Sequence, residues 1–364
     1  MRIECARGDL LSVIQMVARG ISTRSTLPIL SGILFRAENN GLSLQTTDLE
    51  IAIRSAIDVK VDREGSTVIP ARILGDVVRS LDEAALSLES EGGQATLRAQ
   101  KSVFELRTLP PEDFPKFPEI SPRQECRLPA STIKDLVRQV GRAVSNDETR
   151  PVLTGILLVA DGGMLRLVAT DSYRLAMREV KLDAPIEQPI RVLVPARTLE
   201  ELVKVVPDAE EQITLAVGEN QAVITFRNTT FVTRLIEGQF PNYEQLLPDN
   251  YSTRVVADKE ELMAAAKRVS LFALHSSPLR MLAENGIVRL SAASQDVGGA
   301  QEEVSVEQEG DTIEIALNAQ FLIDGLGTMA GEKVAIELTT PLKPGLIKST
   351  EQEHLYLIMP VRIS

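Results

Sequence analysis

Apolar residues recur with a helical period in six segments of the chain and alternate with polar residues in the stretches between them. The helical segments are residues 7–19, 71–81, 130–144, 196–206, 258–272 and 319–330. Alternating stretches such as 33–37 and 42–45 predict half-buried strands, separated by turn sequences such as Asn39-Asn40-Gly41. The order helix, strands, helix, strands occurs three times. This order predicts an α+β fold with two helices packed on antiparallel sheets in each copy.

One part of the chain is present twice with little change. Residues 28–48 align without gaps to residues 151–171, with 10 identities in 21 positions, whereas unrelated sequence gives about one. The motif Pro70-Ala71-Arg72 returns as Pro195-Ala196-Arg197 and, in a weaker form, as Asn318-Ala319-Gln320. The spacing is that of whole domains. Together with two proline-rich stretches, it predicts three similar domains: 1–121, 122–249 and 250–364.

The distribution of charged residues along the chain is more informative about function than the net charge. The formal net charge is −12, from 39 basic and 51 acidic residues, which argues against a protein that grips nucleic acid by its overall charge. Yet cations recur on the polar faces of five of the six expected helices, and equivalent helices in a repeated array present these faces alike. We therefore expect a local surface for a polyanion, made of Arg19, Arg72, Arg79, Lys134, Arg138, Arg142, Arg197, Lys204 and Lys267, with Arg24 just beyond the first helix.

The residues of catalytic and metal sites are scarce in this chain. There are two histidines, His275 and His354, and two cysteines, Cys5 and Cys126, at matching positions of two copies. We expect no catalytic triad, no zinc site, no cofactor and no disulfide. No apolar run approaches the length of about 18 residues that a membrane span needs, so a cytoplasmic protein is expected. Asp48 and Asp171 are repeat equivalents that Asx turns would explain.

The motifs that define the repeat also carry a resemblance. They are Leu27-Pro28-Ile29-Leu30, Ala169-Thr170-Asp171-Ser172-Tyr173-Arg174-Leu175-Ala176, Phe240-Pro241-Asn242-Tyr243 and Leu357-Ile358-Met359-Pro360-Val361-Arg362. By their order and spacing over the whole length, the chain resembles the bacterial sliding clamps, the beta subunits of DNA polymerase III.

The resemblance implies a non-catalytic processivity factor of DNA replication. Two chains would form a head-to-tail homodimer, a closed ring that encircles double-stranded DNA and slides along it without regard to sequence. The replicative DNA polymerase catalytic subunit, the clamp loader, repair polymerases and mismatch-repair proteins would bind through short linear motifs.

The resemblance also implies where these motifs bind, in a cleft between the second and third domains. Carried over position by position, its lining is Leu153, Thr170, Ser172, Tyr173, Arg174, Leu175, Pro241, Gln245, Leu246, Pro344, Met359, Pro360, Val361 and Arg362. The aliphatic members would form an apolar pocket, and Arg174 and Arg362 would meet acceptors of the peptide. Ser172, Tyr173 and Gln245 depart from residues found in some clamps, so the preferred motif is expected to differ.

The family's dimer seam joins the first domain of one chain to the third domain of the other. Phe104, Leu106, Leu271 and Phe272 are the residues expected there, although Phe272 fits a domain core equally well. Two alternatives to the clamp remain open from the residues alone. One is a repeat-built peptide-binding scaffold that does not encircle DNA, and the other is a hydrolase that uses Asp48 or Asp171.

Overall fold

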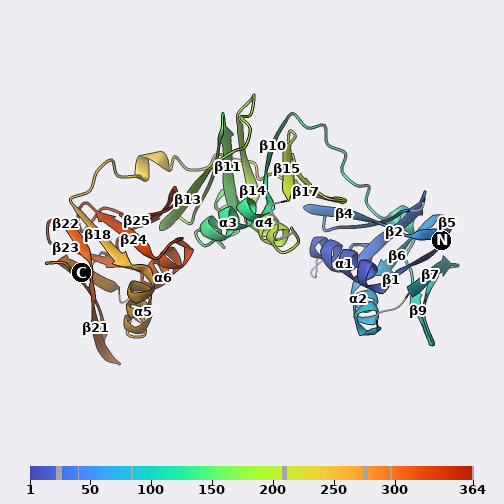
Figure 1. Cartoon of the computed structure of the whole chain (residues 1–364), viewed down its shortest axis with the longest axis horizontal. Helices are drawn as coiled ribbons and strands as arrows, with labels where there is room; N and C mark the ends of the chain where they lie inside the picture. Colours follow the sequence, from blue (N-terminus) through green and yellow to red (C-terminus); the bar gives the residue numbers. More distant parts are fainter. Residues whose placement is uncertain are drawn as a thin grey trace. The chain divides into compact units, whose positions relative to one another are not determined.

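The chain forms two compact units in the computed structural model (Figure 1), which describes residues 1–21, 27–39, 41–82, 85–206, 211–273, 278–295 and 297–362. Unit 1 contains Met1–Ser131 and Glu201–Leu235, and unit 2 contains Thr132–Glu200 and Ile236–Ser364. Each unit is built from antiparallel sheets with helices packed on them, so the expected α+β class is confirmed.

Unit 1 holds two sheets. The strand order is β5-β1-β7-β8-β9 in the smaller sheet and β10-β15-β16-β17-β4-β3-β2-β6 in the larger one. The strands are β1 (Arg2–Ala6), β2 (Gly32–Glu38), β3 (Gly41–Thr47), β4 (Ile51–Asp58), β5 (Lys60–Arg63), β6 (Gly65–Pro70), β7 (Ala85–Glu91), β8 (Gln94–Ala99), β9 (Ser102–Arg107), β10 (Gln124–Pro129), β15 (Gln212–Val217), β16 (Gln221–Phe226) and β17 (Thr229–Arg234).

Unit 2 repeats this plan. Its larger sheet has the order β14-β11-β12-β13-β26-β25-β24-β18-β22, and its smaller sheet has the order β21-β20-β19-β23. The strands are β11 (Gly155–Asp161), β12 (Met164–Thr170), β13 (Arg174–Lys181), β14 (Ile190–Pro195), β18 (Thr253–Asp258), β19 (Leu279–Glu284), β20 (Ile287–Ser294), β21 (Gly298–Ser305), β22 (Glu307–Gly310), β23 (Ile313–Leu317), β24 (Lys333–Leu338), β25 (Gly345–Ser349) and β26 (His354–Ile358).

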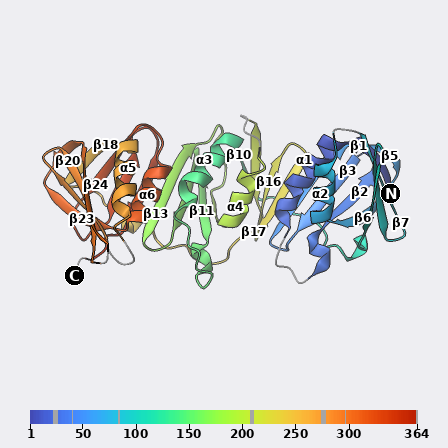
Figure 2. The same ribbon diagram turned by 90° about the horizontal axis from the view of Figure 1, so that it is seen from below.

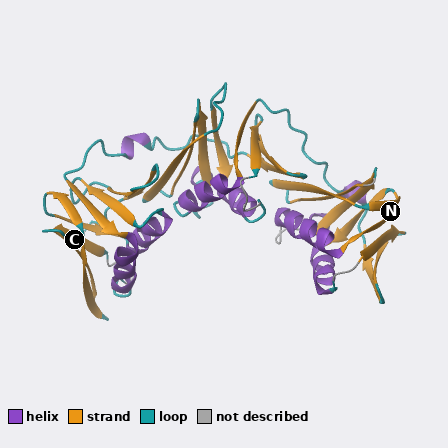
Figure 3. Cartoon of the chain, in the orientation of Figure 1, coloured by secondary structure: helices purple, strands orange, loops and turns teal. Residues whose placement is uncertain are grey.

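All six expected helices are confirmed, each slightly shorter than its apolar period (Figure 3). They are α1 (Arg7–Val17), α2 (Ala71–Ser80), α3 (Ala130–Gly141), α4 (Ala196–Val203), α5 (Lys259–Ser270) and α6 (Ala319–Thr328). Asp258 and Asn318 cap α5 and α6 by accepting hydrogen bonds from Glu261 N (2.8 Å) and Phe321 N (3.2 Å). Short 3-10 turns lie at η1 (Ala18–Gly20), η2 (Pro28–Ser31), η3 (Pro111–Asp113), η4 (Pro151–Leu153) and η5 (Glu244–Leu246).

Different elements cover the two faces of the larger sheet in unit 1. Because successive side chains of a strand point to opposite faces, neighbours on β3 meet different elements. The Thr46 hydroxyl donates to the carbonyl of Val17 at the end of α1, whereas Gln45 Nε2 donates to the carbonyl of Pro115 at 3.2 Å. Helices α1 and α2 therefore cover one face (Figure 2), and the segment 110–122, which we call the first linker, crosses the other.

Unit 2 has the same two-sided arrangement. Gly325 of α6 lies so close to Tyr356 of β26 that an added Cβ would stand 2.6 Å from its ring, so α6 packs tightly on this face. The neighbouring residues Leu355 and Leu357 join an apolar cluster on the opposite face with Phe240 and Tyr243. Residues 236–249, which we call the second linker, thus cross the face that α6 leaves free.

Both larger sheets continue through the boundaries expected at 121 and 249. Strand β17 pairs with β4, and β13 pairs with β26, so that strands from two copies belong to one sheet. Long-range pairing of this kind leaves no trace in the local pattern of a sequence. The division into three domains remains a prediction, and the contacts group the chain into the two units described above.

Cys5 lies on β1 and Cys126 on β10, as the repeat predicts, and both are free thiols. Burial, and secondarily a nearby carboxylate, raises the pKa of each thiol to about 11, so both are protonated at neutral pH. Among the described residues, no helix is long and apolar enough to cross a membrane.

Candidate functional site

The two Thr-Asp pairs build the same turn, once in each unit. In unit 2, Asp171 Oδ1 accepts from Tyr173 N (2.9 Å) and Arg174 N (3.0 Å), and in unit 1 Asp48 Oδ1 accepts from Glu50 N (3.0 Å) and Ile51 N (2.7 Å). The residue after each aspartate is left-handed, with φ of 80° at Ser172 and 77° at Leu49. The predicted Asx turns are therefore confirmed, and they account for both carboxylates without catalysis.

An apolar cluster lies beside the turn of unit 2. Leu175, Phe240, Tyr243 and Leu357 are buried in it, with exposed fractions of 6 % or less. The rings of Phe240 and Tyr243 meet edge to face, with centroids 6.3 Å apart. The Tyr243 hydroxyl is satisfied by Arg166 Nη1 at 3.2 Å. The second linker is thus anchored by two aromatic side chains on the sheet.

The segment after β26 joins this cluster to the turn. Met359 N donates to the carbonyl of Tyr173 at 2.9 Å, and Val361 N donates to the carbonyl of Ala316 at 2.8 Å. The Met359 side chain packs against the cluster and is half-buried. Residues 359–361 therefore run from the turn before β13 to the end of β23.

Two large apolar side chains next to the cluster are open to solvent. Tyr173 is 62 % exposed and Leu246 is 42 % exposed, although each belongs to a segment that contacts the cluster. The other predicted cleft residues differ in exposure: Leu153, Thr170 and Leu175 are buried; Arg174, Pro344, Met359, Pro360 and Val361 are half-buried; Ser172, Pro241, Gln245 and Arg362 are exposed. An apolar floor with exposed apolar side chains beside it is suited to a short hydrophobic peptide.

The expectation that Arg174 offers its guanidinium to a ligand is corrected by its contacts. Nε donates to Asp171 Oδ2 at 2.9 Å, and Nη1 donates to Asp324 Oδ2 at 2.5 Å and to the Tyr356 hydroxyl at 3.0 Å. The guanidinium carbon also lies 4.4 Å from the centre of the Phe321 ring. Since the side chain is 13 % exposed, its role is internal: it ties the turn before β13 to helix α6 and strand β26.

Sequence reasoning did not single out three residues of this region. Arg150 donates to the Ser172 hydroxyl at 3.2 Å and to Asp147 Oδ2 at 2.9 Å, and so braces the turn. Phe321 and Asp324 on α6 complete the surroundings of Arg174. A usable signal was present: both α6 residues follow the third copy of the Pro-Ala-Arg motif and, three positions apart, lie on the same side of the helix.

The helix cations are mostly exposed, with one exception. Arg138 and Arg142 on and just after α3 are exposed, whereas Lys134 is 7 % exposed, so its predicted place on the solvated stripe is wrong. Residues four apart drift by about 40° around a helix, which brings the first member of this row to the buried side. Three further cations are exposed: Arg72, Arg197 and Lys267. Arg79 pairs with Asp76 at 3.0 Å. Glu201 pairs with both Lys204 (2.7 Å) and Arg19 (3.5 Å). Arg24 lies outside the described residues.

Two smaller sheets end in strands whose outer edge is unpaired within the described chain. They are β9 in unit 1 and β21 in unit 2. Val103 on β9 is 52 % exposed and Leu271, just after α5, is 70 % exposed. Phe104 and Phe272 are half-buried. Leu106 is 8 % exposed within its own chain, so this side chain belongs to the core of unit 1 and has little surface left for a seam.

Comparison with known proteins gives matches along the whole chain. Residues 1–118, 127–242 and 244–362 match the family models of the N-terminal, central and C-terminal domains of the DNA polymerase III beta subunit. A Beta sliding clamp of Streptomyces coelicolor is 34 % identical over 380 residues, and one of Bacillus subtilis is 30 % identical over 383 residues, each with 100 % of both chains covered.

Solved structures give the same result for the fold. The DNA polymerase sliding clamp of Bacillus subtilis superposes with a TM-score of 0.96 at 29 % identity, and the DNA polymerase III subunit beta of Pseudomonas aeruginosa with a TM-score of 0.96 at 31 % identity. Both comparisons cover 100 % of this chain and 100 % of the solved chain.

Proposed function

The chain belongs to the family of DNA polymerase III beta subunits, the bacterial sliding clamps, and from this premise we propose how its parts serve replication. It is a processivity clamp, which keeps a DNA polymerase on its template. We propose that it does so as a non-catalytic ring in the bacterial cytoplasm, closed around duplex DNA by two chains. The observation that carries this proposal is the match of all three family models in order along one chain.

The cleft in unit 2 is proposed as the docking site for linear motifs of the replicative polymerase, the clamp loader and repair proteins. Its support is the apolar cluster around Leu175 and Leu357, next to the exposed side chains of Tyr173 and Leu246. A peptide that covers these side chains would gain a binding free energy of about 25 cal/mol for each Å² of apolar surface that it buries. Arg174 is assigned the task of positioning the turn that carries Tyr173, in place of direct contact with the peptide.

Ring closure is proposed through the unpaired edges of β9 and β21. An unpaired strand edge is a template for another strand, and a head-to-tail dimer would pair β9 of one protomer with β21 of its partner. The exposed side chains of Val103 and Leu271 supply apolar area near these edges. Because each protomer carries one edge of each kind, a closed dimer leaves none of these edges free.

Contact with DNA is proposed for the exposed helix cations, above all those without an ion pair in the described part of the chain: Arg72, Arg138, Arg142 and Lys267. A small number of unpaired cations would let the ring slide along DNA, because contacts between many cations and the phosphates would hold the ring in place. The test is retention of the protein on DNA after loading by the clamp loader of the same bacterium. A ring is expected to stay on circular DNA and to leave the same DNA once it is linearised.

The paired variant Arg138→Glu with Arg142→Glu separates the clamp from a peptide-binding scaffold. We expect it to reduce loading and processive synthesis at least tenfold, while binding to the isolated polymerase subunit stays unchanged. Exposed Arg227, which pairs with Glu211 on unit 1, is a matched control site for loss of a surface cation. Unchanged processivity in the paired variant would favour the scaffold.

A further inference from the structure

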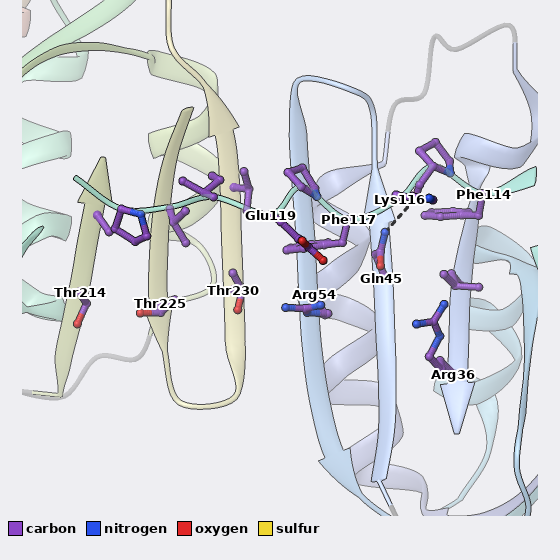
Figure 4. Close-up of a pocket in the computed structure, with 18 of the residues that line it drawn as sticks. Arg36, Gln45, Arg54, Phe114, Lys116, Phe117, Glu119, Thr214, Thr225 and Thr230 are labelled. Atoms are coloured by element: carbon purple, nitrogen blue, oxygen red, sulfur yellow. Dashed lines mark hydrogen bonds between the residues drawn. The ribbon is translucent and has the colours of Figure 1, made fainter. Parts of the chain in front are cut away.

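A pocket of 830 Å³ lies in unit 1, under the first linker and on the face of the larger sheet opposite α1 (Figure 4). Its floor includes one lateral row of cross-strand neighbours: Thr214, Thr225, Thr230, Arg54 and Gln45, on β15, β16, β17, β4 and β3. The row ends beneath the linker, where Gln45 donates to the carbonyl of Pro115. The sheet therefore forms the floor of the pocket, and the first linker forms its wall.

Three residues in the wall of this pocket are repeat equivalents of residues predicted for the peptide cleft. Pro115, Glu119 and Ile120 line the pocket. Their equivalents 126 positions later are Pro241, Gln245 and Leu246, three predicted residues of the cleft. Phe114 likewise corresponds to Phe240. The same linker geometry on the same kind of sheet indicates the same class of ligand, an extended peptide.

The floor, in contrast, has different chemistry from that of unit 2. Gln45 and Arg54 stand where the second copy has Val168 and Met177. The Arg54 guanidinium carbon lies 4.3 Å from the centre of the Phe117 ring, and no carboxylate of the described residues lies within ion-pair distance of it. The hydroxyls of Thr225 and Thr230 also have no hydrogen-bond partner among the residues described. Two further cations line the pocket: Arg36, which is paired with Glu38 at 3.7 Å, and Lys116 on the linker.

We propose that this pocket is a second peptide site, which takes an extended segment of a partner protein with one carboxylate side chain at Arg54. An apolar side chain of the same segment would lie over Val223 and Val232, which also line the pocket. Three glutamates in the lining, Glu112, Glu119 and Glu125, repel a polyanion such as nucleic acid and leave room for a single acidic group. The proposal depends on the proposed cleft of unit 2 in one respect, the class of ligand.

The test uses a phage-displayed library of random 12-residue peptides, selected on the full chain. Leu246→Glu disables the cleft of unit 2, and Thr225→Trp fills the floor of the pocket without adding charge. We expect a class of acidic peptides that binds the Leu246→Glu protein normally and loses at least tenfold in affinity on Thr225→Trp. Changing their Asp or Glu to the amide should weaken binding at least threefold on the original chain and have no further effect on Arg54→Gln.

Each outcome decides between the two sites. If every selected peptide is lost on Leu246→Glu and kept on Thr225→Trp, the second site does not exist, while the proposed cleft stands. If no peptide is sensitive to either change, both proposals fail. Thermal melting checks the fold of each variant, and Thr230→Trp replaces Thr225→Trp if the latter does not fold.

Discussion

The two sheet junctions of the molecule share one backbone plan and differ in their side chains. In unit 1, β4 pairs with β17, and Arg54 faces Thr230 while Ser55 faces Thr229. In unit 2, β13 pairs with β26, and the equivalent neighbours are Met177 with Leu355 and Arg178 with His354. A linker crosses the same face in both units, with Phe117 at the position where the second copy has Tyr243.

The difference lies in what holds each linker. Phe117 is half-exposed and stacks on Arg54, whereas Tyr243 is 2 % exposed inside an apolar cluster. On the helix-covered face, unit 1 has a buried hydroxyl pair, Ser55 and Thr229 at 2.9 Å, where unit 2 has Arg178 and His354. Repetition of the backbone thus places a linker on the same face of the sheet in both units, and the side chains at a few equivalent positions determine what holds it.

Truncating the two aromatic linker residues should give the largest difference in stability between the two junctions. Tyr243→Ala removes a buried ring, which costs about 3–5 kcal/mol of unfolding free energy, whereas Phe117→Ala removes a half-exposed ring and should cost about 1 kcal/mol. Urea unfolding of both variants measures the difference. Equal losses would mean that the two linkers are held alike.

Acid should weaken unit 2 through His354, whose equivalent in unit 1 is Thr229, a side chain that does not titrate. Burial, and secondarily the Arg178 guanidinium, lowers the pKa of His354 from 6.5 to about 4. The unfolded chain therefore binds more protons between these values, so the stabilising contribution is complete above about pH 6.5 and is lost as the pH falls toward 4. The loss reaches about 3 kcal/mol.

The matched variant for this prediction is His354→Thr, which installs the Thr229 equivalent. Urea unfolding at pH 7.5, 6 and 5 should show a smaller decrease in stability for the variant than for the original chain. The same slope in both proteins would show that His354 does not titrate in this range.

The Arg174 contacts should add a coupling that unit 1 lacks, because Ile51 is the equivalent residue there. A double-mutant cycle with Arg174→Met and Asp324→Asn should give an interaction of about 1–3 kcal/mol. Polymerase binding is expected to fall in Arg174→Met because the turn carrying Tyr173 loses its support. Additive effects of the two substitutions would contradict the assigned role.

The smallest expected effect concerns one exposed linker residue. Leu246→Glu should weaken binding of the replicative polymerase subunit at least tenfold, which is about 1.4 kcal/mol, and leave unfolding almost unchanged. Its repeat equivalent Ile120 is half-buried and lines the pocket of unit 1, so Ile120→Glu is the comparison variant, and surface plasmon resonance with immobilised polymerase measures both. Similar losses in both variants would place polymerase binding at the first junction as well.

The sequence predicted the local elements of this fold because their signals are local. The apolar period of 258–272 marks α5, and the Thr-Asp pairs mark the two turns. The repeat then placed equivalent elements in each copy. Resemblance added the cleft residues, of which Leu175 and Met359 belong to or pack against the apolar cluster of unit 2.

The remaining features depend on contacts between distant residues. The neighbours of Arg174 come from α6 and β26, 150 and 182 positions away. The burial of Lys134 follows from small angular drift along α3, which a period counted in whole turns does not resolve. The pocket of unit 1 needs the pairing of β4 with β17 and the path of the linker at once.

The pairing of β17 with β4 and of β13 with β26 bears on how such a protein can be taken apart. A fragment cut at residues 121 and 249 would keep β17 and β13 but lose the strand beside each of them. Both strands would then expose long bare edges, and the fragment is expected to aggregate when expressed by itself. The repeated sequence segments and the continuous sheets therefore divide the same chain at different places.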